Sequence, residues 1–262
     1  MKRMILTGLV AIGAGAMCLM AQGAPPKAQG GKPPAGTKAP KSQGELEALQ
    51  ALQAAGNDPD KAIAASEALI TKFADTDFKS IALYIEADAY ERKGDFNRME
   101  IYAERVLEAD PTDFRAGLML AKHYATHTGA NDLDKEEKLA KGDKYANQVI
   151  EMMKTAPKPN AGVTDEQWAE VRKDSTAEAY SSMGLGNLTR KKYDAAAANF
   201  KSAVEANSRP EPAYMVRLAS ALQQAGKNDE AVQWCDKVLA IPDVHPTIKN
   251  LATQIKGNAA KK

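Results

Sequence analysis

Apolar residues recur at spacings of three and four along most of the chain beyond residue 45, which is the period of amphipathic helices. Residues 80–113 show the pattern most clearly, as two such segments around a turn at Gly94 and Asp95. The apolar faces of the two segments consist of Leu83, Ala87 and Tyr90 and of Met99, Ala103, Val106 and Leu107. Pro111 ends the second segment, since proline lacks the N–H that a helix needs. Helices this short cannot bury both faces against each other, so the pair requires neighbouring pairs.

The same pattern continues on both sides of this stretch. Ala121 and Tyr124 follow Ala87 and Tyr90 at an interval of 34 residues. A charged insertion over 129–138 interrupts the third pair. We predict five helical hairpins and one capping helix, over about 45–76, 80–113, 114–157, 177–210, 212–245 and 246–256. A capping box at Thr164 and Gln167 begins another helix, which either continues into the fourth pair at Ala177 or bends near Asp174 and Ser175.

A period near 34 residues with small and aromatic residues at set points resembles the tetratricopeptide repeat (TPR). One set of matching residues is Ala87, Tyr90, Gly94, Phe96 and Pro111; others are Gly184, Tyr193, Ala196, Phe200 and Ala203, and Ala219, Gly226 and Ala231. The first and third pairs match poorly. The resemblance implies an all-α fold, a right-handed α–α superhelix or TPR solenoid spanning about residues 45–258.

The resemblance also implies a concave groove lined by the first helix of each pair, where a peptide or protein segment binds. The groove positions carried over to this chain include Tyr84, Asp88, Arg92, Arg115, Leu118, Lys122, Leu185 and Gln223, with Glu91 and Ser181 on the same faces. We expect this groove to be charged at one end and partly apolar at the other. The clamp for a C-terminal carboxylate found in some family members is not expected, because Glu47 and Asp88 occupy two of its positions and would repel the anion.

Residues 1–23 read as a secretory signal peptide, with Lys2 and Arg3 before an uncharged apolar run and small residues at Ala21 and Gly23. The alternative is a retained membrane anchor. Met17 before Cys18 does not suit a lipoprotein signal. Residues 24–44, rich in Ala, Pro, Gly and Lys, predict a disordered linker. We therefore expect a periplasmic or secreted protein.

Candidate chemistry is sparse. The chain has three histidines and a formal net charge of +1, which gives no global field for nucleic acid. His123 and His127 have the spacing of two metal ligands on a helix, with Asp132, Asp134 and Glu136 following, but the pattern lacks a catalytic glutamate. The glycines around Met183–Asn187 do not follow a strand, as a phosphate loop would require. We expect no cofactor, no metal site and no enzymatic activity.

The predicted function is a non-catalytic scaffold of the bacterial cell envelope that binds another protein or peptide. The alternative is a membrane-tethered factor for envelope or outer-membrane assembly. No membrane span is expected in the mature protein. The sequence identifies neither the partner nor the oligomeric state.

Overall fold

The computed structural model describes residues 39–160 and 162–260 of the 262-residue chain. This part of the chain forms eleven α-helices and contains no β-strand. The helices are α1 (Gln43–Ala54), α2 (Pro59–Lys72), α3 (Lys79–Lys93), α4 (Phe96–Ala109), α5 (Phe114–His127), α6 (Lys135–Thr155), α7 (Asp165–Thr189), α8 (Tyr193–Ala206), α9 (Pro212–Gln224), α10 (Asn228–Leu239) and α11 (Pro246–Ala259).

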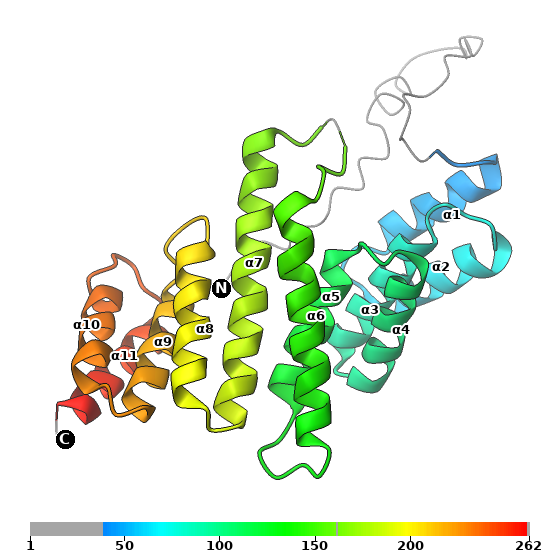
Figure 1. Cartoon of the computed structure of the whole chain (residues 1–262). Coiled ribbons are helices and arrows are strands. Elements are labelled where there is room, and N and C mark those ends of the chain that lie inside the picture. Colours follow the sequence, from blue (N-terminus) through cyan, green and yellow to red (C-terminus); the bar gives the residue numbers. More distant parts are fainter. Residues whose placement is uncertain (1–38, 161, 261–262) are drawn as a thin grey trace.

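Helices α1 to α10 are stacked in chain order, and α11 lies beside α9 and α10 (Figure 1). Each helix packs on the next one in the chain. In addition, α7 packs on α5, and α11 packs on α9. The chain therefore forms a row of antiparallel helical hairpins closed by one extra helix, which is the architecture of an α-solenoid. This row agrees with the predicted fold class, a helical-repeat superhelix.

Side chains at the helix ends set the hairpin boundaries. Asp58 precedes α2 and its carboxylate accepts hydrogen bonds from the backbone N–H groups of Asp60 and Lys61, with Pro59 in the first turn. Helix α3 ends at Gly94, whose φ of 74° is left-handed and favours glycine. These local signals terminate each helix and turn the chain back onto the previous one.

Small residues occupy the positions where helix backbones approach closely. A Cβ atom placed on Gly184 of α7 would lie 2.6 Å from the Phe200 ring of α8, and the Phe200 side chain is fully buried. Likewise, a Cβ on Gly117 of α5 would lie 2.8 Å from the Val149 side chain of α6. Glycine at these points lets a large neighbour fill the space between two helices.

Helices α6 and α7 are the longest, with 21 and 25 residues, and one end of this hairpin projects beyond the neighbouring α8 (Figure 1). Helix α7 is continuous, so the bend considered near Asp174 and Ser175 does not occur. The Asp174 carboxylate instead accepts a hydrogen bond from the backbone N–H of Ser208, beyond α8, and Ser175 is buried. The capping box of Thr164 and Gln167 begins this helix.

The N-terminal predictions lie mostly outside the described residues. The signal peptide over 1–23 and residues 24–38 of the predicted linker belong to that part of the chain. Helix α1 begins at Gln43, two residues before the predicted start at Glu45, because the Ser42 hydroxyl accepts a hydrogen bond from the Glu45 N–H.

Candidate protein-binding face

The first helices of four successive hairpins, α3, α5, α7 and α9, carry a connected row of polar side chains. We call this row the first-helix face and define it by Tyr84, Asp88, Glu91, Arg92, Arg115, Lys122, Glu178, Ser181, Tyr214 and Arg217. Its members interact from helix to helix, so the side chains lie along one surface. Most of them are partly buried.

The row begins with a contact between Tyr84 and Arg115. The Arg115 guanidinium of α5 lies 4.3 Å from the centroid of the Tyr84 ring of α3, in a cation–π contact. The Arg115 Nε also donates to the Asp113 carboxylate at 3.0 Å. Burial raises the pKa of the Tyr84 phenol far above its usual range. The tyrosine is therefore a neutral group whose ring is held by Arg115.

Two ion pairs follow in the next helical turns. Arg92 Nε lies 2.9 Å from the Asp88 carboxylate on the same helix. Lys122 Nζ of α5 donates to the Glu91 carboxylate of α3 at 2.7 Å. The predicted charged end of the groove therefore contains charges of both signs that already have counter-charges.

Glu178 and Arg217 extend the row over α7 and α9. Arg217 donates a hydrogen bond to the Ser181 hydroxyl at 2.8 Å, joining the two helices. Burial raises the pKa of the Glu178 carboxyl group, and Lys122 opposes this shift more than Arg217 does. Glu178 in turn contributes to raising the pKa of the Tyr214 phenol, so these side chains form one electrostatic group.

The predicted apolar end is more deeply packed than the charged end. Leu185 is partly buried against the core formed by α8, α9 and α10. Leu118 is buried in the core between α5, α6 and α7, at 8% exposure, because α7 packs directly on α5. Gln223 donates a weak hydrogen bond, of 3.5 Å, to the Ile255 carbonyl of the capping helix α11. Leu118 and Gln223 thus serve packing in this structure.

Sequence reasoning named Tyr84, Asp88, Arg92, Arg115 and Lys122, and the structure brings these side chains together on neighbouring helices. Glu178, Tyr214 and Arg217 were missed. Their positions in the repeat could have indicated them. Glu178 lies one helical turn before Ser181, and Tyr214 and Arg217 of α9 both interact with residues of α7.

The two helical histidines form a ring stack and do not converge on a common point. The His123 and His127 rings lie 5.0 Å apart, and Phe96 covers His127 at 3.9 Å between centroids. His123 Nε2 lies 3.3 Å from the Glu100 carboxylate, and burial lowers the pKa of His123. Over residues 39–160 and 162–260, no three His, Cys, Asp or Glu side chains gather as a metal would require.

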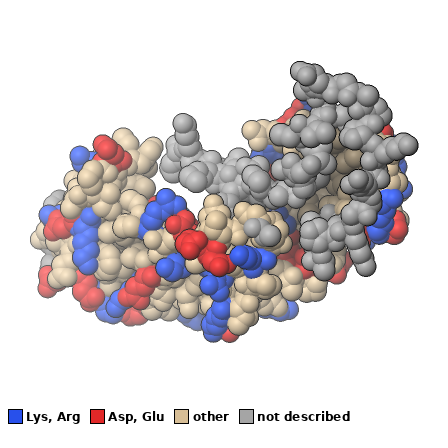
Figure 2. Space-filling view, turned by 90° about the horizontal axis from the view of Figure 1, so that it is seen from above, with Lys and Arg blue, Asp and Glu red and all other residues tan. Residues whose placement is uncertain are grey.

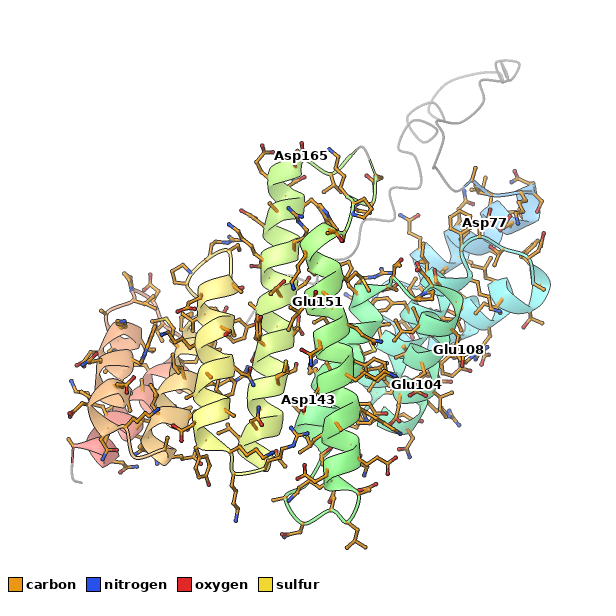
Figure 3. The ribbon with its side chains drawn as sticks, in the orientation of Figure 1. Asp77, Glu104, Glu108, Asp143, Glu151 and Asp165 are labelled. Carbon is orange, nitrogen blue, oxygen red and sulfur yellow. The ribbon has the colours of Figure 1, made fainter. Side chains whose placement is uncertain are left out.

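A cavity of about 350 Å³ lies between α4, α5 and α6, with Glu104, Glu108 and Lys144 at its walls and Leu107 and Val149 among its apolar residues. Figure 3 labels Glu104 and Glu108 on α4. The Tyr145 hydroxyl lies 3.2 Å from the Glu104 carboxylate and bridges the two helices.

Charge over the surface is mixed. Lys, Arg, Asp and Glu side chains are interspersed on the face seen in Figure 2. In the part of the chain that the structure describes, no helix is both long enough and apolar enough to cross a membrane.

The fold defines the class of protein: a helical-repeat protein of stacked antiparallel hairpins. Tetratricopeptide-repeat family models match residues 81–113 and residues 183–246. The chain therefore contains tetratricopeptide repeats over these two stretches.

Several solved structures are similar to the chain, among them two of tetratricopeptide-repeat proteins. TTC0263, a thermophilic TPR protein of Thermus thermophilus, is 19% identical with a TM-score of 0.49, over 80% of this chain and 98% of that one. The TPR domain of P58(IPK) is 15% identical with a TM-score of 0.32, over 82% of this chain and 64% of that one. No curated protein matches the chain.

Proposed function

We propose that the chain is a non-catalytic scaffold of the bacterial cell envelope that binds a protein segment along its first-helix face. The TPR fold itself suggests a protein–protein interaction scaffold. The observation that carries the proposal is the connected row of aromatic and charged side chains across α3, α5, α7 and α9. A row of this kind presents side-chain anchors at regular intervals to an extended or helical segment.

The envelope location rests on the sequence of residues 1–23, which has the order of regions found in a secretory signal. Mass spectrometry of the native protein tests it. A free N-terminus at Ala24 supports a secreted or periplasmic protein, whereas a lipidated Cys18 or an intact N-terminus supports the membrane-tethered alternative.

Binding through the first-helix face is tested by exchanging charges within its two ion pairs. The variant carries Asp88→Arg with Arg92→Asp, and Glu91→Lys with Lys122→Glu. Both pairs and the net charge are preserved, and circular dichroism establishes that the variant folds. The signs presented to a ligand are reversed, which suppresses binding of a complementary segment.

The chain and this variant are compared by crosslinking and pull-down from an envelope fraction. We expect a partner that the original chain captures and the variant captures about tenfold less. The control exchanges the exposed pair on α8, as Lys201→Glu with Glu205→Lys, and should retain the partner. Equal capture by all three chains would overturn the proposed use of this face.

A further inference from the structure

The acidic residues of the first-helix face differ in whether they have a counter-charge. Asp88 pairs with Arg92 at 2.9 Å and Glu91 with Lys122 at 2.7 Å. The carboxylate of Glu178, in the middle of the face, forms no ion pair and no hydrogen bond among the described residues, although the cations Lys122 and Arg217 and the anion Glu91 act on it from a distance.

Both neighbouring cations are already committed. Lys122 of α5 donates to Glu91, and Arg217 of α9 donates to the Ser181 hydroxyl. Each of these contacts connects two helices and holds the cation at a partner other than Glu178. The carboxylate therefore stays between two occupied cations.

An unpaired carboxylate on the floor of a helical face is unfavourable for the isolated chain. Burial raises the pKa of Glu178, which means that the surroundings penalise its charge. Groups of this kind are usually hydrogen-bonded in folded proteins, and an exception calls for an explanation. The residue is only partly buried, so a ligand can reach it.

Tyr214 adds an aromatic ring to the surroundings of Glu178. The charge of the Glu178 carboxylate on α7 contributes to raising the pKa of the Tyr214 phenol on α9, which places the two groups within electrostatic range of each other. A carboxylate beside an aromatic ring suits a cation on an apolar stem, because the ring packs on the methylene groups while the carboxylate accepts the N–H donors.

We propose that Glu178 is the anchor point for a lysine or arginine side chain of the protein segment that binds the first-helix face. This inference rests on the proposed function and specifies its ligand: a segment with a basic side chain over α7, next to Tyr214.

The test uses a phage-displayed library of random 12-residue peptides, selected on the chain. Enriched peptides are synthesised as such and with each Lys or Arg replaced by Gln, and their affinities are measured by calorimetry. The protein variants are Glu178→Gln and a matched control, Glu166→Gln, which makes the same change on the exposed first turn of α7. Circular dichroism establishes that both fold.

We expect one basic position in the enriched peptides whose replacement weakens binding about tenfold. Glu178→Gln should weaken binding of the original peptide by a similar factor and have less than about a twofold effect on the Gln-substituted peptide, since both changes remove the same contact. Glu166→Gln should bind as the unaltered chain does.

The remaining outcomes separate this inference from the proposed function. Peptides that bind the first-helix face without a basic preference, or bind Glu178→Gln equally well, overturn the inference alone. An acidic preference that Arg217→Gln abolishes also overturns it, in favour of an anion-binding position. No enrichment, or enriched peptides that bind the charge-exchanged variant equally well, overturns both.

Discussion

Glu86 of α3 is a carboxyl group in the packed interior. It is 1% exposed, and its Oε1 atom has no hydrogen-bond partner. Burial raises the pKa of Glu86 to about 7; a hydrogen bond with Tyr102 opposes the shift, Glu67 adds to it and Arg105 reduces it. The folded-state pKa therefore lies above the unfolded value, near 4.5.

This shift predicts a pH-dependent free energy of unfolding. The contribution of Glu86 is fully present below about pH 4.5 and is lost as the pH rises through about 7, by at most about 3 kcal/mol. Glu86→Gln should remove this dependence and stabilise the protein by about 1–3 kcal/mol at pH 8. Urea unfolding between pH 5 and 8 measures both effects. Glu108→Gln, at an exposed position, should leave the profile unchanged; a wild-type profile as flat as that of Glu86→Gln would contradict the prediction.

Adding a single methyl group at Gly184 should destabilise the protein by a steric clash. Gly184→Ala would place a methyl group 2.6 Å from the Phe200 ring, which is fully buried and cannot move aside without disturbing α8. We expect a loss of about 1–3 kcal/mol in the free energy of unfolding. Gly257→Ala in α11 is the control, because a Cβ there meets no atom within 4 Å; it should be neutral or stabilising by up to about 1 kcal/mol. Equal stability of the two variants would argue against close packing at Gly184.

The role of Gly184 was readable from the sequence, whereas that of Glu178 was not. A glycine at a repeat position predicts close approach of two helices, since the position itself defines the packing. Whether the Glu178 carboxylate finds a cation depends on Lys122 and Arg217, which lie 56 and 39 positions away in the sequence. No local periodicity encodes that pairing. The sequence therefore predicted several members of the first-helix face but not which charge is left without a partner.

At the scale of elements, the long hairpin of α6 and α7 is held together by Arg190 at the end of α7. The side chain is 7% exposed and reaches two acidic residues of α6, with Nε 3.0 Å from Glu136 and a terminal nitrogen 2.9 Å from Asp143. Burial raises the pKa of Asp143 even though Arg190 opposes the shift. The arginine therefore compensates a carboxylate that is costly to bury.

Removing this arginine should leave Asp143 partly buried without its counter-charge. We expect Arg190→Gln to lower the free energy of unfolding by about 1–3 kcal/mol. Lys154→Gln removes an exposed pair with Glu151 on the same helix and should cost less than about 0.5 kcal/mol. Chemical denaturation measures the free energy of unfolding of the unaltered chain and of both variants. Similar stabilities for the two variants would show that Arg190 contributes no more than a surface pair.

The continuity of α7 marks a limit of sequence reasoning at this scale. Asp174 and Ser175 are poor helix formers, so a bend was a reasonable alternative. The Asp174 carboxylate accepts a hydrogen bond from the backbone N–H of Ser208, 34 residues away, and Ser175 is buried. Tertiary contacts thus override the local preference, and these contacts cannot be read from a single segment.

Across the whole molecule, each hairpin depends on its neighbours for burial of its apolar face, and α11 ends the row. This helix packs on α9 and α10 and buries Ala252 and Ile255 against a core that contains Cys235. Cys235 is fully buried and is a free thiol, and burial raises the pKa of this thiol. The reactivity of Cys235 therefore reports whether the end of the row is closed.

Deleting residues 246–262 should open this end without affecting the other end. In a linear array the loss of one unit exposes only the adjacent interface, so we expect alkylation of Cys235 to become about a hundredfold faster and amide exchange in α9 and α10 to rise, while exchange in α3 and α4 stays the same. Peptide-level mass spectrometry measures both quantities. Leu251→Ser, on the exposed side of α11 at 42% exposure, is the control and should leave Cys235 protected. Faster exchange throughout the chain after the deletion would mean that the helices unfold as one cooperative body, whereas a local change would show that stability passes only between adjacent hairpins.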